Sequence, residues 1–457
     1  MSDYQSFLSA KRQSYAEHGI QPNYSNDAAF DYQNYVAELA IRRGRCAEFL
    51  DTGLGKTLIQ LVVAQNYIRK LNRPALIITP LAVAFQFLKE AEKFGIDDIE
   101  YSRDGKHSKK IVVCNYERIE KFDASDFCVF ILDESSILKN FDGATKAKLT
   151  AFLRKADYRF LFTATPSPND FIELGTSSEA LGYMGYMDML SRFFTNNEDT
   201  ISPTKIGVKW QLKPHAERDF FAWVSSWSVS MRKPSDLGFD DSRHILPELS
   251  VVDNVVRNKN LLCINGQFEL IPKPSSRLTK VRDEQKQTIE ERCERAVTLA
   301  TGKDCSVYWV NFNKEAEAIR EMDPAAREIK GSMPLEKKEE LLLAFADGQI
   351  SRLITKPKIT SFGLNWQHCA HTVYFPTFSY EQYYQAVRRF WRFGQKRPVT
   401  VDLVYSEGQE KVVQSLVAKA EKANQLFSNL NAAINQDFTD NKKEFSKQVQ
   451  LPTFLGA

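Results

Sequence analysis

The sequence predicts an α/β protein with two parallel-sheet domains and a helical segment between them. In two separate regions, short runs rich in β-branched and aromatic residues alternate with helical patterns, which is typical of parallel sheets covered by helices. The alternation fades over residues 176–279, which separate the two regions. A chain of 457 residues is also too long for one ordinary core and indicates two or three domains.

The first α/β domain is expected over residues 25–175, after an N-terminal extension over residues 1–24. A helical pattern over residues 58–67 follows its first apolar run. The apolar runs that we assign to strands are 46–50, 75–79, 111–114, 127–132 and 158–162. In such a sheet the carboxyl ends of the strands form one edge, where ligands bind.

The segment over residues 176–279 is predicted to be a helical insertion. Phe220, Trp223, Trp227 and Met231 recur at a spacing that fits one helix face. Large aromatic side chains are usually interior, so this pattern favours a core of the insertion's own. The alternative is contact with a nucleic-acid backbone, for which the interleaved basic residues are Lys209, Arg232 and Lys233.

The second α/β domain is expected over residues 280–430, followed by a polar tail over residues 431–457. Its predicted strands are 306–310, 352–355, 371–375 and 399–404, with a leucine-rich helix over 335–345. The charged stretch 280–295 lacks Gly and Pro and predicts a helix whose charges form a solvated face.

Composition excludes several classes of protein. Hydrophobic content of 43% and charged content of 26% are typical of a soluble globular chain, and no apolar run is long enough to span a bilayer. The seven cysteines are scattered, without a Cys-x-x-Cys pair, and predict buried thiols rather than a disulfide framework or a zinc site. The first residues lack a signal-peptide pattern, so we expect a cytoplasmic protein. A net charge of +3 permits a nucleic-acid partner without requiring one.

A glycine-rich turn between the first apolar run and the following helix is the first candidate site. A strand, glycines, Lys-Thr and then a helix is the order that wraps backbone N–H groups around nucleotide phosphates. Lys56 is expected to contact the β and γ phosphates, and Thr57 to supply an oxygen to Mg²⁺. The predicted nucleotide-binding residues are Thr52, Gly53, Leu54, Gly55, Lys56 and Thr57. The alternative is a chance Gly-Lys-Thr in a loop.

Two acidic residues, Asp133 and Glu134, follow the apolar run 127–132 at the ligand-binding edge of the predicted sheet. Asp133 suits a Mg²⁺ partner, and Glu134 suits the group that orients attacking water or accepts its proton. A helix N-cap is the alternative for this pair. Thr163 and Thr165 end the run 158–162 at the same edge, either as relays of γ-phosphate state or as a strand-ending turn.

In the second domain, the basic stretch over residues 385–395 predicts a helix that carries two arginines. Arg389 and Arg392 are three residues apart and share a face on a helix, which Gly394 is placed to end. Guanidinium groups presented to a bound nucleotide would stabilise transition-state charge. The alternative is an exposed basic helix.

Taken in order, these motifs resemble those of superfamily 2 helicases and translocases, with the closest likeness to the Snf2-like branch. The seven matching segments are Tyr32-Gln33, Gly53-Leu54-Gly55-Lys56-Thr57, Thr79-Pro80, Asp133-Glu134-Ser135-Ser136, Thr163-Ala164-Thr165-Pro166, Ser361-Phe362-Gly363-Leu364-Asn365 and the stretch 385–395. A further segment, residues 232–239, is similar to one found in compact helicase-like proteins of bacteriophages and prophages.

The resemblance implies two RecA-like lobes with a helical insertion between them, and an ATP and Mg²⁺ site in the cleft between the lobes. In this family Gln33 would read adenine, Thr57 and Asp133 would hold the metal, and Arg389 and Arg392 would act as arginine fingers. We therefore expect a monomeric ATP-dependent translocase on DNA, most simply duplex DNA. A strand-separating helicase on single-stranded DNA or RNA, and a nucleotide-gated scaffold with little hydrolysis, remain alternatives.

Overall fold

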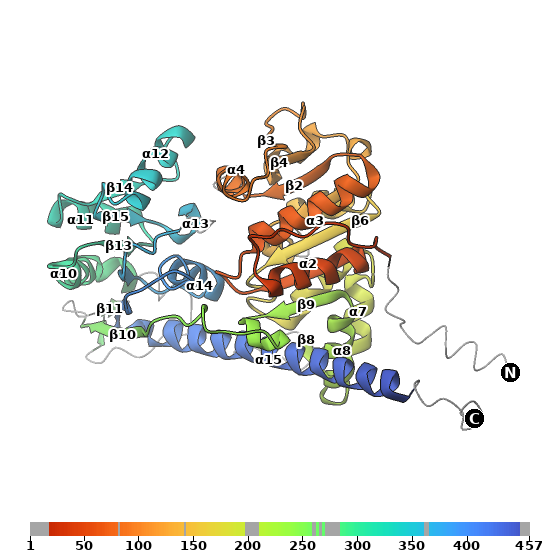
Figure 1. Cartoon of the computed structure of the whole chain (residues 1–457). Helices are drawn as coiled ribbons and strands as arrows, with labels where there is room; N and C mark the ends of the chain where they lie inside the picture. Colours follow the sequence, from red (N-terminus) through yellow and green to blue (C-terminus); the bar gives the residue numbers. More distant parts are fainter. Residues whose placement is uncertain are drawn as a thin grey trace, which may run out of the picture. The chain divides into compact units, whose positions relative to one another are not determined.

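The structure, a computed structural model, consists of two compact units, each built on its own parallel sheet (Figure 1). It describes residues 18–80, 83–140, 143–196, 210–257, 262–264, 267–269, 284–360 and 365–447. The first unit comprises Met1–Thr79, Leu88–Asp240 and Ala423–Ala457, and the second comprises Pro80–Phe87 and Asp241–Lys422. No helix in the described part of the chain is long and apolar enough to cross a membrane.

The first unit contains a seven-stranded sheet in which every neighbouring pair of strands is parallel. Its strand order is β3-β4-β2-β5-β6-β1-β9. The strands are β1 (Arg45–Leu50), β2 (Ala75–Thr79), β3 (Ile99–Tyr101), β4 (Ile111–Asn115), β5 (Val129–Leu132), β6 (Tyr158–Thr163) and β9 (Ser228–Met231). All five strands predicted for the first domain are therefore present in one sheet.

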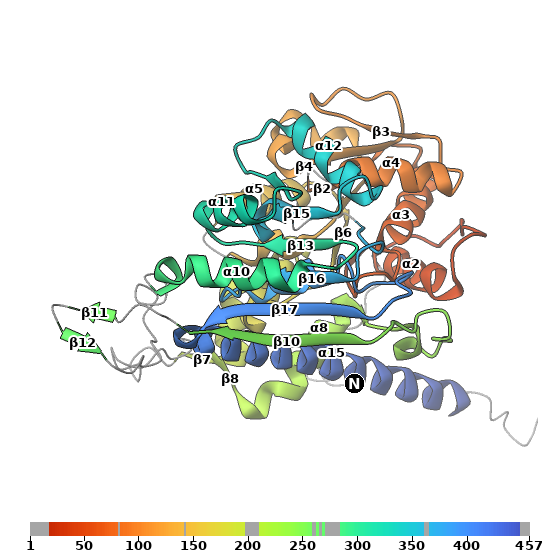
Figure 2. The same ribbon diagram turned by 90° about the vertical axis from the view of Figure 1, so that its left-hand side faces the viewer.

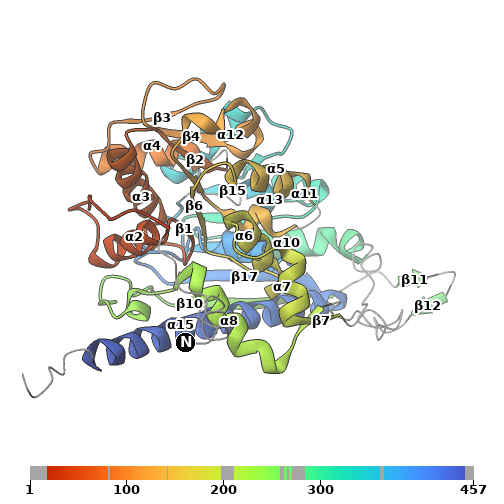
Figure 3. The same ribbon diagram turned by 90° about the vertical axis from the view of Figure 1, so that its right-hand side faces the viewer.

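Helices cover both faces of this sheet (Figure 3). On one face, Tyr67 of the helix after β1 packs against Phe160 of β6. On the other face, Leu161 belongs to a core that includes side chains of α5, α6, α7 and α8. The helices are α2 (Asp31–Arg43), α3 (Lys56–Leu71), α4 (Ala84–Lys93), α5 (Ala144–Leu153), α6 (Leu174–Leu181), α7 (Tyr186–Phe193) and α8 (Glu217–Trp227).

The aromatic residues of the predicted insertion form part of the first unit's core. Phe220, Trp223 and Trp227 lie on α8 and are buried as predicted, but they share the core of the first sheet instead of forming a core of the insertion's own. Met231 does not continue the helix face, because α8 ends at Trp227 and Met231 lies in β9. The insertion is thus not helical throughout: β9 pairs with β1 and extends the sheet, and β7 (Phe194–Asn196) and β8 (Trp210–Leu212) form an antiparallel pair.

The second unit contains a six-stranded parallel sheet in the order β10-β17-β16-β13-β15-β14 (Figure 2). Its strands are β10 (Leu249–Val256), β13 (Ser306–Trp309), β14 (Arg327–Ile329), β15 (Arg352–Thr355), β16 (His371–Tyr374) and β17 (Val399–Ser406). Its helices are α10 (Ile289–Ala300), α11 (Asn313–Met322), α12 (Leu335–Ala346), α13 (Pro357–Thr360) and α14 (Tyr380–Val387). A short hairpin, β11 (Leu262–Ile264) and β12 (Gln267–Glu269), completes the described strands.

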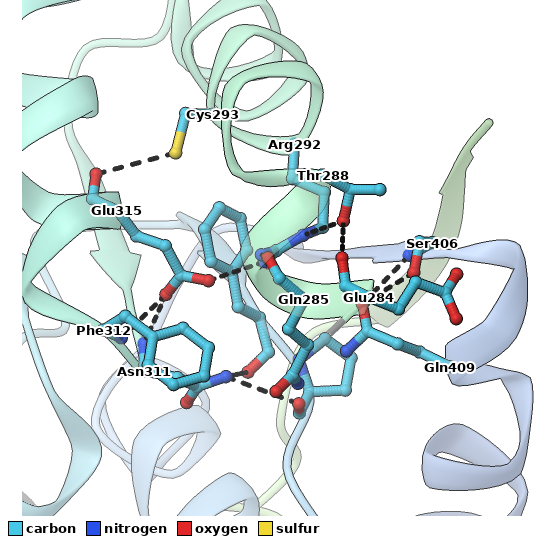
Figure 4. A network of polar contacts seen from close by, with 12 residues as sticks. Glu284, Gln285, Thr288, Arg292, Cys293, Asn311, Phe312, Glu315, Ser406 and Gln409 are labelled. Atoms are coloured by element: carbon cyan, nitrogen blue, oxygen red, sulfur yellow. Dashed lines mark hydrogen bonds and ion pairs between the residues drawn. The ribbon is translucent and has the colours of Figure 1, made fainter. Parts of the chain in front are cut away.

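The charged stretch over residues 280–295 differs from its prediction as a solvated face. Glu284 and Arg292 are buried, and Arg292 forms an ion pair of 2.7 Å with the equally buried Glu315 of α11 (Figure 4). The Nε of Arg292 also donates to the hydroxyl of Thr288. The pattern of charges alone did not predict this buried pair, because the partner carboxylate comes from a helix beyond the next strand.

The C-terminal end of the chain also differs from the prediction. Helix α15 runs over Glu410–Lys447, so the predicted tail from residue 431 begins inside a helix. Leu426 and Leu430 on this helix belong to the core of the first unit. The guanidinium of Arg232, next to β9, donates to the side chain of Asn424 at 2.7 Å. The part of α15 around residues 424–430 is therefore a structural element of the first unit.

Candidate active site

The glycine-rich turn forms the connection between β1 and α3 that the sequence predicts. Gly53 and Gly55 have φ angles of 89° and 76°, a backbone region that favours glycine. The Nζ of Lys56 donates to the carbonyls of Leu50 and Asp51 at 2.9 and 3.1 Å, so the ammonium lies beside the start of the turn. The turn therefore has the curled backbone and the lysine that a phosphate-binding loop requires.

Gln33 lies against this loop and supports it. Its Nε2 donates to the carbonyl of Leu54 at 3.0 Å, and the hydroxyl of Tyr32 donates to the same carbonyl at 3.1 Å. A Cβ on Gly55 would stand 2.0 Å from Nε2 of Gln33 and would displace that side chain, and the φ angle of 76° at Gly55 also favours glycine. The structure thus brings Gln33 to the loop, and its predicted role in reading adenine stays a prediction.

Asp133 follows β5 at the carboxyl edge of the first sheet, as predicted. Its Oδ1 accepts a hydrogen bond of 2.8 Å from Gln60, and its Oδ2 accepts one of 3.1 Å from Thr79. Burial of the carboxyl group and the neighbouring Glu134 raise the pKa of Asp133 to about 6, and the ammonium of Lys56 offsets part of this rise. Asp133 is therefore close enough to Lys56 to share one site with it.

Glu134 has a backbone conformation that L residues rarely adopt. Its φ angle is 50°, and non-glycine residues with positive φ are concentrated at functional sites. Its Oε1 accepts hydrogen bonds of 2.8 Å from both Ser136 and Thr163. Glu134 stands at an N-cap position but makes no side-chain capping bond, so the simple capping alternative does not describe it. The hydroxyl groups of Ser136 and Thr163 instead hold the Glu134 side chain in its orientation.

Thr163 connects the end of β6 to the acidic pair. Its hydroxyl donates to Glu134, and the same oxygen accepts a bond of 3.0 Å from the backbone N–H of Thr165. Of the two interpretations left open by the sequence, the strand-ending turn is present and the relay of γ-phosphate state stays a prediction. The segment is a strand-ending turn, and its first hydroxyl contacts the carboxylate that we expect to act on water.

The side chains at this edge suit a nucleotide with its divalent cation. Asp133 is held by two neutral donors, Gln60 and Thr79, in surroundings that disfavour its charge. A cation bound there would favour the charged carboxylate, and carboxylate and hydroxyl oxygens are the ligands that Mg²⁺ prefers. Asp133 and Thr57 are the residues that would hold it.

The two arginines of the second unit differ from their predicted setting. Helix α14 ends at Val387, so Arg389 and Arg392 lie in the turn after the helix rather than on a helix face. The carbonyl of Arg389 accepts a bond from the backbone N–H of Trp366, which draws the chain out of the helix. Arg389 is buried, and burial together with Arg392 lowers its pKa to about 9. Its guanidinium lies 4.7 Å from the ring centre of Trp366.

The remaining segments of the family pattern are placed only in part. Residues 361–364 lie outside the described residues, so most of the predicted Gly-Leu-Asn segment is not placed. Gly394 has a φ angle of 93° and ends the arginine-bearing turn. Gln395 donates to the carbonyls of Gln367, Cys369 and Phe390 at 3.0 to 3.2 Å. Gln395 therefore fixes this turn to the segment before β16.

Several residues of the site were not found from the sequence. Gln60 lies one helical turn after Lys56 on α3, and this spacing could have indicated it. Tyr116, directly after β4, bonds through its hydroxyl to the carbonyls of Asp133 and Glu134. Phe239 packs 5.5 Å from the ring of Tyr35 beside Gln33, and no local pattern in the sequence indicated that contact.

Comparison with known families places the two units in one class of protein. Residues 31–168 match the family described as type III restriction enzyme, res subunit. Residues 288–394 match the helicase conserved C-terminal domain. Two such domains in this order define a helicase core of superfamily 2.

Individual relatives narrow the class. The SWI/SNF-related matrix-associated actin-dependent regulator of chromatin subfamily A-like protein 1 of Xenopus tropicalis is 30% identical over 150 residues, which cover 31% of this chain and 16% of that protein. The DNA annealing helicase and endonuclease ZRANB3 of Mus musculus is 27% identical over 188 residues, covering 37% of this chain and 17% of that protein. These matches support an Snf2-like helicase of superfamily 2. The matched stretches span about a sixth of each relative's length.

A solved structure supports the fold. A point variant of S. cerevisiae Dbp5, bound to RNA and ADP BeF3, has a TM-score of 0.54 at 12% sequence identity, and the match covers 89% of this chain and 100% of that chain. At this level of identity the likeness concerns the fold alone. It agrees with the two RecA-like parallel-sheet lobes that the sequence predicts.

Proposed function

We propose that this protein is an ATPase that couples hydrolysis to movement along DNA, with duplex DNA as its track. The observation that carries the proposal is the gathering of Lys56, Asp133 and Glu134 at one edge of the first sheet, with Thr163 bonded to Glu134. A phosphate loop beside paired carboxylates is the arrangement that phosphoryl transfer to water requires.

Each residue of the first unit has a separate role in this proposal. The backbone N–H groups of the loop and the ammonium of Lys56 bind the β and γ phosphates of ATP. Glu134, directed by Thr163, orients the attacking water and takes its proton. Bound Mg²⁺, held through Thr57 and Asp133, would neutralise charge on the phosphates. Gln33 supports the loop and reads the adenine ring.

Arg389 and Arg392 complete the proposed chemistry. We assign them to the charge that develops on the transferred phosphoryl group, where a guanidinium is worth about 10³- to 10⁵-fold in turnover. The lowered pKa of Arg389 reflects its burial and the nearby guanidinium of Arg392. A buried Arg389 does not fit the alternative of an exposed basic helix.

DNA is proposed as the track because the relatives matched in sequence are named for action on DNA or chromatin. Contacts with a nucleic-acid backbone are mainly ionic, so binding is expected to weaken steeply with salt and to depend little on sequence. A phage or prophage source, a cytoplasmic location and a monomeric state remain predictions from the sequence.

The experiment that tests the proposal compares ATP turnover with duplex DNA, single-stranded DNA and RNA in parallel at one salt concentration. We expect duplex DNA to stimulate turnover most, without release of a labelled strand from a partial duplex. The Lys56→Ala variant serves as the control for contaminating ATPases.

The other outcomes select the alternatives. Strand release that depends on ATP would replace translocation with strand separation. Stimulation by RNA or single-stranded DNA alone would overturn the duplex assignment. If none of the three polymers raises ATP turnover, but the protein binds nucleic acid in a nucleotide-dependent way, the scaffold alternative would be favoured.

A further inference from the structure

Two cysteines of the second unit lie together at the amino-terminal edge of its sheet, away from the edge where the strands end. Cys305 directly precedes β13, and Cys369 precedes β16 by two residues. The two strands pair in parallel, with Val307 opposite Thr372. The hydroxyl of Ser306 also contacts Nδ1 of His371 at 2.8 Å, which continues this register toward the cysteines. Adjacent strands lie about 4.8 Å apart, a separation that a disulfide can bridge.

The surroundings of the two sulfur atoms differ from those of the other described cysteines. The Sγ of Cys305 lies 3.7 Å from Nε2 of His368. The Cys369 thiol is within hydrogen-bonding reach of the Cys305 sulfur. The Cys369 thiol also contacts the carbonyl of His371 at 3.3 Å. Hydrogen bonds from Cys369 and His368, with the positive charge of Arg352, lower the pKa of Cys305 to about 6. Burial instead raises the pKa of Cys293 to about 12.

We propose that Cys305 and Cys369 form a dithiol that hydroperoxides oxidise reversibly to a disulfide, with Cys305 as the attacking thiolate and His368 as its partner. Cys305 is 8% exposed and Cys369 is fully buried, which favours Cys305 as the first to meet the oxidant. Within the described residues, no group of three or more histidine, cysteine and acidic side chains is arranged to hold a metal ion, which favours thiol chemistry over metal binding.

The chemistry balances with hydrogen peroxide as the oxidant. The Cys305 thiolate attacks one peroxide oxygen and forms a sulfenic acid, while the other oxygen leaves as hydroxide and takes up a proton. The Cys369 thiol then attacks the sulfenic sulfur, a sulfur–sulfur bond forms, and water leaves. Two thiols have lost two electrons and two protons, and one peroxide has become two waters.

The position of the pair makes its oxidation relevant to the arginine-bearing turn. Gln395, at the end of that turn, donates to the carbonyl of Cys369 at 3.2 Å. The backbone of Cys369 is therefore tied to the segment that carries Arg389 and Arg392.

The test uses the reduced full-length protein, treated with increasing hydrogen peroxide, alkylated and digested with trypsin. Cys305 and Cys369 fall in separate tryptic peptides, 304–314 and 359–388. Mass spectrometry is expected to find these two peptides cross-linked, and dithiothreitol to release them. The cross-link should vanish in Cys305→Ser and Cys369→Ser and persist in the control Cys293→Ser. This readout does not depend on ATP turnover.

A second measurement follows alkylation of Cys305 by iodoacetamide as a function of pH. The midpoint is expected near pH 6, and His368→Gln should move it upward. Circular dichroism of each variant checks that the fold is retained. A folded protein in which Cys305 stops at sulfinic acid, or in which Cys293 reacts as fast as Cys305, would overturn the proposal.

Discussion

The hydroxyl of Thr163 donates a hydrogen bond of 2.8 Å to Oε1 of Glu134. This bond joins the ends of β5 and β6, which are neighbours in the sheet although 29 residues separate the two side chains. The carboxylate that we expect to act on water is thereby held from a second strand. Thr163 is a positioning residue in this arrangement, because it acts through Glu134.

Removal of that hydroxyl is expected to slow hydrolysis more than it weakens ATP binding. Thr163→Val keeps the shape of the side chain but leaves Glu134 with Ser136 alone, so we expect turnover to fall about 10- to 100-fold. Affinity for ATP, measured with a fluorescent analogue, should change less than about two-fold because Thr163 has no proposed contact with the nucleotide. Thr163→Ser, which restores the hydroxyl, should recover most of the turnover. Equal losses in Thr163→Ser and Thr163→Val would contradict the positioning role.

The phosphate loop and the acidic pair give a second prediction. Lys56→Ala removes the ammonium proposed to bind phosphate, and Glu134→Gln removes the proton acceptor, so each should reduce turnover by about 10³-fold or more. Lys70→Ala, an exposed lysine at the far end of the same α3, is the matched control and should be unchanged. Near-normal ATP turnover in purified Lys56→Ala or Glu134→Gln would contradict the assignment of that residue to the ATPase site.

Arg392 is expected to affect turnover without affecting nucleotide binding. A guanidinium that stabilises transition-state charge contributes little to the ground state, so Arg392→Ala should lower turnover by about 10³-fold and leave ATP affinity nearly intact. Arg397→Ala, at an exposed arginine that pairs with Asp304, is the control. If affinity and turnover fall in proportion, Arg392 binds the nucleotide rather than the transition state.

The buried Glu48 on β1 predicts a specific pH dependence of stability. Neither of its carboxyl oxygens has a hydrogen-bond partner among the described residues, and burial raises its pKa from 4.5 to about 8. The folded state therefore retains the proton over a range in which the unfolded state has lost it. The stability that this proton provides is complete below about pH 4.5 and is lost as the pH rises to about 8.

The measurement compares wild type with Glu48→Gln, which is permanently neutral. Between about pH 5 and 8 the free energy of unfolding of wild type should fall relative to the variant by about 1.4 kcal/mol per pH unit. Glu38→Gln, on the exposed face of α2, should follow wild type. Parallel denaturant curves for wild type and Glu48→Gln across this range would show that Glu48 does not hold a proton.

The buried pair of Arg292 and Glu315 gives a prediction about the second unit. Arg292→Met leaves the Glu315 carboxylate buried without a cation and should cost about 3 to 5 kcal/mol of unfolding free energy. Arg292→Met combined with Glu315→Gln removes the uncompensated charge and keeps an acceptor for the N–H groups of Asn311 and Phe312. The double variant should recover part of the loss.

The control for this pair is a surface ion pair of the same unit. Lys337 and Glu340 of α12 are both more than half exposed where they pair, so Lys337→Met should cost less than about 1 kcal/mol. Urea unfolding monitored by tryptophan fluorescence measures all three variants. A double variant that is no more stable than Arg292→Met alone would show that Glu315 acts through its backbone contacts only.

The sequence by itself determined the central strands of both sheets and the phosphate loop, but not the edge strands β3, β9, β10 and β14. Runs such as 75–79 and 352–355 match β2 and β15, because a buried parallel strand needs a continuous apolar stretch that any reader of the sequence can find. Gly53, Gly55 and Lys56 were equally clear, because the loop needs positive φ angles and a lysine at fixed spacing. Each of these features depends on residues that are close together in the sequence.

Only the tertiary structure decided how these parts are joined. The order β2-β5-β6-β1-β9 sets which strand ends meet, and so brings Thr163 to Glu134 and adds β9 beside β1. The tertiary structure also ends α14 at Val387. There the backbone N–H of Trp366 donates to the carbonyl of Arg389, which takes the place of the helix that the sequence predicted. The physical reason is that such contacts depend on the packing of segments far apart in the chain, which local periodicity does not encode.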